Sequence, residues 1–158
     1  MLIIDDCSRF TWVYFLHRKD EAFACFKDWK MYVEEESGRQ VKALRADKGG
    51  EFTSNAFIRF CTENGIRREL ANTGSPWENV VVEQKNTTVV EMTRTMLEHR
   101  ELPRSLWAEA ASTAVHIINR APTAALQKTT PYEVYFGKKP DVSHFRVFGC
   151  DAHVHVAK

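Results

Sequence analysis

The stretch ELANTGSPWENVVVEQKNTTVVEMTR, residues 69–94, decides how the whole chain is interpreted. Its first part is rich in turn formers, with Asn72, Gly74 and Pro76 close together, and its second part has the apolar spacing of an amphipathic helix. Glu83 lies in the first turns of that predicted helix, where the helix dipole favours a negative charge. Glu83 is therefore either an ordinary helix-start acid or part of a binding site.

A second carboxylate, Asp47, lies upstream, and 35 residues separate it from Glu83. It follows the short apolar strand predicted over residues 41–46 and precedes Lys48-Gly49-Gly50, which by itself is typical of a turn. Taken together, a strand-end acid and a helix-start acid provide the oxygen ligands that Mg²⁺ prefers. Such ions activate a water or hydroxyl in phosphodiester chemistry, so Asp47 and Glu83 are candidate metal ligands.

Two acids are too few to hold two ions, so a third carboxylate would have to come from a central strand. Asp5 and Asp6 are the available candidates, and the simpler role for both is to open a hairpin turn. A nuclease site that uses Asp5 as its third acid is retained as an alternative. His153 and His155 share one face of a predicted strand, but no third ligand has the spacing of a metal site.

Basic residues continue along the predicted third helix and the turn after it. They fit two interpretations equally well, contacts to phosphates or a solvated helix face. The residues concerned are Lys85, Arg94, Arg100 and Arg104, and the pairs Arg67-Arg68 and Lys138-Lys139 are ambiguous in the same way.

The composition is that of one ordered globular domain, with 158 residues of which 44% are apolar and 27% charged. A net charge of +1 provides no overall basic field, so any contact with nucleic acid must come from local patches. The four cysteines are scattered without a CxxC pair, which favours reduced intracellular thiols over a disulfide framework or a zinc site. No apolar run approaches the length of a membrane span, and the first residues do not resemble a signal peptide.

The predicted elements alternate between strands and helices. Asp20 is expected to cap the first helix and Ser54 the second. Strands are expected at residues 2–5, 11–17, 41–46, 66–70, 146–148 and 152–156, and helices at residues 20–36, 55–63, 80–100 and 105–121. The expected buried faces are Ala22, Phe26, Trp29 and Val33 on the first helix and Leu106, Ala110, Ala114, Ile117 and Ile118 on the fourth. This order predicts an α/β fold in which helices pack on a mixed sheet.

Five ordered blocks of the chain together resemble the integrase core of copia-type retrotransposon polyproteins. The resemblance implies a ribonuclease H-like fold whose two aspartates and one glutamate bind Mg²⁺ or Mn²⁺ and join element DNA to a target by transesterification. It also implies a core over residues 1–125 and a post-core segment over residues 126–158. The blocks are IDDCSRFTWVYFL (4–16), VKALRADKGGEFTSNAFIRFCTENGIRREL (41–70), SPWENVVVEQKNTTVVEMTRTML (75–97), LPRSLWAEAASTAVHIINRAPT (102–123) and TPYEVYFGKKPDVSHFRVFGC (130–150).

Carried over by this resemblance, Asp47 matches the second aspartate and Glu83 the glutamate, so both are expected to be catalytic and to bind metal. Lys85 and Asn86 fall in the family's stretch after the glutamate, where a lysine would face DNA, and Arg94 is expected to contact DNA as well. Members of the family act as homo-oligomers on DNA, so the expected partners are DNA and further copies of the chain, with no membrane. A working enzyme of this kind would act in the nucleus.

The chain also departs from the family pattern. The first aspartate normally lies in a central strand before the block IDDCSRF, so we expect an N-terminally truncated sheet in which the flanking strands either leave a gap or pair directly. Lys48 replaces the usual asparagine, Val80 a glycine and Gln84 an arginine. We therefore expect an integrase fragment that is inactive in isolation. The alternative is a remnant that binds DNA or protein without catalysis.

Overall fold

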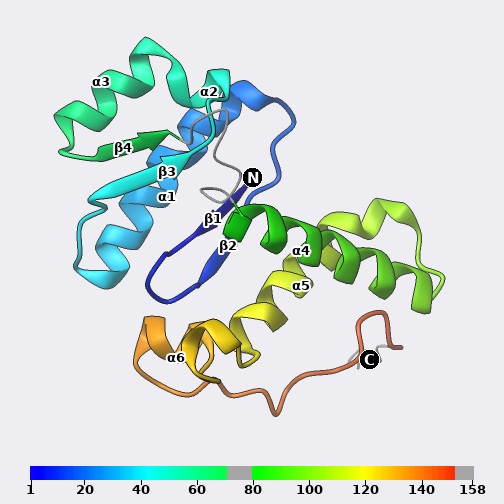
Figure 1. Cartoon of the computed structure of the whole chain (residues 1–158). Helices are drawn as coiled ribbons and strands as arrows, with labels where there is room; N and C mark the ends of the chain where they lie inside the picture. The colour runs from blue at the N-terminus through cyan, green and yellow to red at the C-terminus, as the bar shows by residue number, and fades with distance from the viewer. Residues whose placement is uncertain (71–79, 152–158) are drawn as a thin grey trace, which may run out of the picture. The chain divides into compact units, whose positions relative to one another are not determined.

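The computed structural model describes residues 1–70 and 80–151, and the chain divides into two compact units. The first unit comprises Met1 and Tyr14–Glu83, and the second comprises Leu2–Val13 and Gln84–Lys158. The first contains η1 (Lys19–Glu21), α1 (Ala22–Ser37), β3 (Ala43–Ala46), α2 (Gly50–Thr53), α3 (Asn55–Glu63) and β4 (Arg67–Leu70). The second contains β1 (Leu2–Ile4), β2 (Thr11–Val13), most of α4 (Val80–His99), η3 (Arg104–Leu106), α5 (Trp107–Arg120), η4 (Ala124–Leu126) and α6 (Pro131–Phe136) (Figure 1).

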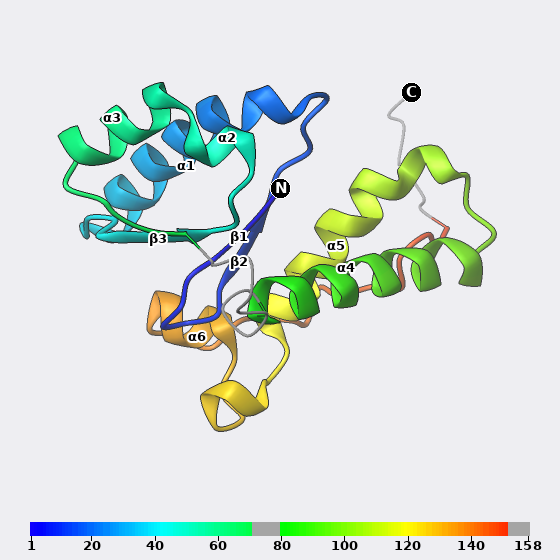
Figure 2. The same cartoon turned by 45° about the horizontal axis from the view of Figure 1, so that its top comes forward.

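The first unit has a core made by two helices. All four residues predicted for the buried face of α1 are buried, and the α1 ring of Phe26 lies 5.3 Å from the ring of Phe57 on α3. Figure 2 shows α1 and α3 on the same side of the strand pair formed by β3 and β4. Gly38 ends α1 in the left-handed conformation with φ of 65°, which glycine adopts without a steric penalty.

The predicted caps have different outcomes. Ser54 caps α3 as predicted, because its hydroxyl accepts the backbone N–H of Phe57 at 3.3 Å. The prediction for Asp20 is wrong, since Asp20 lies inside η1 and pairs with Arg18 at 2.7 Å. The 3-10 turn places Glu21 at the N-cap of α1, and its side chain makes no capping hydrogen bond there.

The strands form two separate two-stranded sheets in the described part of the chain. β1 pairs with β2 in antiparallel fashion, which confirms the predicted hairpin, and β3 pairs in parallel with β4, with Ala43 opposite Arg67. The mixture of antiparallel and parallel pairing was expected, whereas direct pairing of β1 with β3 is not observed. β2 ends at Val13 instead of His17 because β1 provides only three paired residues.

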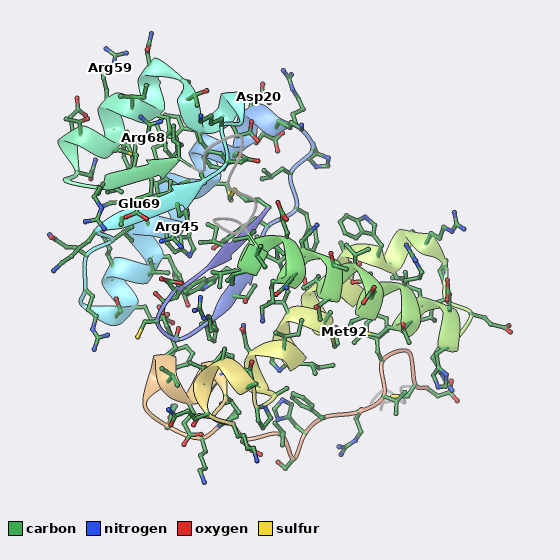
Figure 3. The ribbon with its side chains drawn as sticks, viewed as in Figure 1. Asp20, Arg45, Arg59, Arg68, Glu69 and Met92 are labelled. Carbon is green, nitrogen blue, oxygen red and sulfur yellow. The ribbon has the colours of Figure 1, made fainter. Side chains whose placement is uncertain are left out.

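The second unit packs α4 against α5. Its core contains Val89 of α4 with Ala111, Ala114 and Val115 of α5, and Met92 (labelled in Figure 3) packs against them. Of the face predicted for the fourth helix, Ala110 and Ala114 are buried, and Leu106, Ile117 and Ile118 are half-buried.

The segment after α5 differs from the prediction. Residues 131–136 form α6, a helix that the sequence did not predict, and the Thr130 hydroxyl caps it by accepting the N–H of Glu133 at 3.0 Å. The prediction of a strand at residues 146–148 is wrong. The side chain of Arg146 donates hydrogen bonds to the nearby carbonyls of Ser143 and Phe145, and these residues form no strand. The strand predicted at residues 152–156, with His153 and His155, lies outside the described residues.

Candidate functional site

Asp47 lies at the carboxyl end of β3 and is exposed. Its Oδ1 accepts the backbone N–H of Gly49 at 3.0 Å, which is the turn geometry that the sequence predicted. A Cβ at Gly49 would lie 2.9 Å from this oxygen and 2.8 Å from Oε2 of Glu51, so a larger residue there would displace the two carboxylates. Glu51 therefore lies near the candidate ligand Asp47, and the sequence analysis did not identify it. The available signal was its position four residues after Asp47.

A third acid at this strand pair has a structural role. Glu69 on β4 accepts from Arg45 at 3.1 Å and from Arg67 at 2.8 Å, and these two hydrogen bonds hold the pKa of its carboxyl below the usual range (Figure 3). Arg68 donates to the carbonyl of Phe52 at 2.8 Å and joins β4 to α2. The ion pairs of Glu69 are exposed, so they orient the strands more than they stabilise them.

Glu83 lies in the first turn of α4, as predicted, and is exposed. The loop that leads to it, residues 71–79, lies outside the described residues. Among the residues that are described, no group of three His, Cys, Asp or Glu side chains is placed to hold a metal ion. The carboxylates of Asp47 and Glu83 fit Mg²⁺ in kind, because hard cations take oxygen ligands, but the described residues add no third ligand.

The two acids at the hairpin, Asp5 and Asp6, make hydrogen bonds within its turn. Oδ2 of Asp5 accepts the backbone N–H of Ser8 at 2.7 Å and its hydroxyl at 2.6 Å. Asp6 pairs with Arg9 at 2.6 Å. Both acids therefore have the turn role that the sequence favoured, and the nuclease alternative built on Asp5 gains no support.

The three predicted DNA contacts do not share one face of α4. Arg94 lies nine positions after Lys85, which is two and a half helical turns, so the two side chains leave the helix in opposite directions. Arg94 is exposed on the side of Glu83, whereas Asn86, also exposed, lies in line with the buried Thr93 seven residues later, and Lys85 is half-buried four residues before Val89. Burial, and then the positive charge of Arg9, lower the pKa of Lys85.

The fold is that of a retroviral integrase catalytic core, which belongs to the ribonuclease H-like class. A chain of the simian T-cell lymphotropic virus intasome in complex with PP2A regulatory subunit B56 gamma matches with a TM-score of 0.67 and 19% identity, covering 99% of this chain and 53% of the other. The HTLV-2 integrase catalytic core domain in complex with magnesium, in its trimeric form, matches with a TM-score of 0.62 and 17% identity, covering 84% of this chain and 80% of the other. These two matches define the class of fold as that of a retroviral integrase catalytic core.

The chain belongs to the integrase-core family of retrotransposon Pol polyproteins. A family model described as "Integrase core domain" matches residues 1–76. The Pol polyprotein from transposon TNT 1-94 of Nicotiana tabacum is 46% identical over 155 residues, which is 98% of this chain and 12% of the relative. The Pol polyprotein from transposon RE2 of Arabidopsis thaliana is 33% identical over 150 residues, 95% of this chain and 10% of the relative. The chain thus spans only a small part of these relatives.

Two further features agree with the sequence analysis. All four cysteines are free thiols, as expected from their scattered positions. Among the described helices, none combines the length and the apolar composition that crossing a bilayer requires.

Proposed function

We propose that this chain is the integrase-core segment of a copia-type element, derived from an enzyme for metal-dependent joining of DNA strands. The observation that carries the proposal is the 46% identity with a transposon Pol polyprotein across 98% of the chain. In this proposal residues 1–125 are the core and residues 126–158 the post-core segment. The copia assignment extends the family assignment, and it rests on the five blocks described above.

Within this proposal Asp47 and Glu83 are the catalytic carboxylates and would hold Mg²⁺ or Mn²⁺. Such an ion, when bound, supplies positive charge that stabilises a transferring phosphoryl group and lowers the pKa of an attacking hydroxyl. The exposed carboxylate of Asp47 supports this role, because its Oδ2 and the free lone pairs of Oδ1 can face solvent ions while Oδ1 closes the turn. Lys85, Asn86 and Arg94 would bind and orient the DNA.

We further propose that the isolated chain does not catalyse strand transfer. The described residues contain no group of three His, Cys, Asp or Glu side chains placed to hold a metal ion, and two carboxylates hold too little negative charge for a pair of divalent ions. The side chain of Lys48 adds a positive charge directly after Asp47, which opposes cation binding further.

A second candidate function is a DNA- or protein-binding remnant without catalysis. One observation favours it: the carboxylate of Asp47 already closes a turn. In either case we propose that the chain forms homo-oligomers on DNA and that a functional form acts in the nucleus. The dimeric and trimeric forms named for the HTLV-2 core support the oligomer.

A strand-transfer assay with Mg²⁺ and then Mn²⁺ separates these functions. The wild-type chain, Asp47→Asn and Glu83→Gln should all give no product above background, while salt-dependent binding to the same DNA persists in all three. Strand transfer by the wild type that disappears in Asp47→Asn would overturn the proposed inactivity and would leave the assigned catalytic residues intact. Absence of both activity and DNA binding would overturn the DNA-directed function.

A further inference from the structure

The hairpin turn and the C-terminal end of α6 meet in an aromatic cluster, defined as Phe10, Trp12, Tyr132, Tyr135 and Phe136. The ring of Phe10 lies 4.8 Å from that of Tyr135 and 5.6 Å from that of Phe136, and Trp12 lies 5.4 Å from Tyr135. Figure 1 shows the turn between β1 and β2 beside α6. Two segments that are more than a hundred residues apart in the sequence are thus fixed side by side.

Basic residues flank the two segments that form this aromatic cluster. Arg9 directly precedes Phe10 in the turn, and the guanidinium of Arg120 lies 4.6 Å over the ring of Tyr132. Gly137 ends α6 with φ of 71°, and the exposed Lys138 and Lys139 follow it at once. The turn and the end of α6 therefore present their basic residues from one place.

The local charge is much more positive than that of the chain as a whole. Residues 120–146 contain five Lys or Arg residues and two acids, whereas the whole chain has a net charge of +1. The two acids are Glu133 in the first turn of α6 and Asp141, whose carboxylate accepts the N–H of Ser143 at 2.9 Å. A local excess of this size is what the sequence analysis required of any contact with nucleic acid.

We propose that Arg9, Lys138 and Lys139 form a phosphate-binding surface for duplex DNA. The inference rests on the proposed function and names further DNA-contacting residues for it. The rings of the aromatic cluster stack on one another, with Phe10 in contact with Trp12, Tyr135 and Phe136, so their faces are used in packing. Lys138 and Lys139 are exposed and the side chain of Arg9 is 28% exposed, while among the rings only Phe136 is exposed, so the cations favour recognition of the dense phosphate charge of a duplex over the stacking of unpaired bases.

The test measures binding of a fluorescently labelled duplex to the full chain by anisotropy, over a series of salt concentrations and with EDTA present. Lys138→Ala/Lys139→Ala should reduce the slope of log affinity against log salt by about 2, or about 1 per lysine, and weaken binding by about tenfold per lysine at ~0.1 M salt. Lys138→Arg/Lys139→Arg should restore both values. The matched control is Lys19→Ala/Lys42→Ala, two exposed lysines of the first unit, which should change neither.

One variant should strengthen binding, a result that a folding defect does not produce. Asp6→Asn removes the carboxylate that pairs with Arg9, and Asp6 is the more exposed member of that pair, so we expect a severalfold gain in affinity for the duplex. An unchanged slope in the Lys138/Lys139 variant, with weaker binding in Lys85→Ala, would overturn this surface and leave the proposed function standing. Absence of salt-dependent binding by the wild type would overturn both. If the Lys138/Lys139 variant lost binding to a single strand of the same length and kept its binding to the duplex, the choice of duplex DNA would be overturned.

Discussion

Replacement of Asn119 with alanine should detach the β1–β2 hairpin from α5. Asn119 is 3% exposed, and its side-chain amide makes two hydrogen bonds to the backbone of Thr11: Oδ1 accepts the N–H at 2.9 Å and Nδ2 donates to the carbonyl at 2.8 Å. Thr11 lies opposite Ile4, between the hydrogen-bonded residues of the antiparallel ladder, so its backbone groups point away from β1. Asn119 therefore satisfies two groups that have no partner in β1.

The magnitude follows from what alanine leaves behind. Thr11 is 1% exposed, so water cannot easily replace the lost amide, and each buried polar group without a partner costs about 1–3 kcal/mol. Two such groups reduce the free energy of unfolding by about 2–6 kcal/mol, which is a large part of the ordinary stability of a domain. Asn119→Asp keeps an acceptor for the N–H of Thr11 but places a second acceptor against its carbonyl. The substitution should therefore lower the stability near neutral pH, and the stability should recover as acid protonates the carboxyl.

Urea unfolding followed by circular dichroism measures these changes, with Asn55→Ala as the control because Asn55 is exposed on α3. We expect the control to remain within about 0.5 kcal/mol of the wild type. If Asn119→Ala changed the free energy of unfolding as little as the control does, the two hydrogen bonds would not hold the hairpin against α5. Recovery of Asn119→Asp at low pH would show that the donor to the Thr11 carbonyl is the group that matters.

Three further predictions concern other contacts. Burial, Arg120 and His144 lower the pKa of His116 below 6.5, so the unfolded chain binds a proton more readily, and stability should fall as the pH drops below that value. His116→Asn should flatten this dependence in denaturation curves measured across the window. Gly149→Ala should lower the melting temperature, because φ is 75° and the new Cβ would lie 2.6 Å from Cδ1 of Leu102; an unchanged melting temperature would contradict that packing. Phe57→Ala, at a fully buried ring, should cost about 3–5 kcal/mol, and retention of wild-type stability would mean that the core of the first unit is misassigned.

The helices were the most predictable part of the fold because their signals are local. The stripe from Ala22 to Val33 and the cap at Ser54 depend on spacing and on one hydrogen bond, and both appear as predicted. Asp20 failed because a 3-10 turn intervenes before α1, and local sequence does not distinguish the two helix types at that point. α6 was missed because six residues with two tyrosines and a phenylalanine carry almost no helical period.

The candidate site was predictable in its chemistry and less so in its arrangement. Asp47 at a strand end and Glu83 at a helix start lie in the elements that the sequence predicted. The opposite directions of Lys85 and Arg94 follow from the helical period alone. The sequence analysis grouped the two residues as DNA contacts without applying that period. The approach of Glu51 to Gly49 depends on the backbone of a turn, and no spacing rule would have placed the two carboxylates around one glycine.

By itself the sequence determined the kinds of element, their order and the types of side chain at the candidate site, since these depend on contacts between residues close along the chain. Only the tertiary structure decided which distant segments meet. The contact of Phe10 with α6 and the hydrogen bonds between Asn119 and Thr11 each join residues far apart in the sequence. Such contacts form when buried surface and backbone hydrogen bonds are satisfied together, and a one-dimensional pattern records neither.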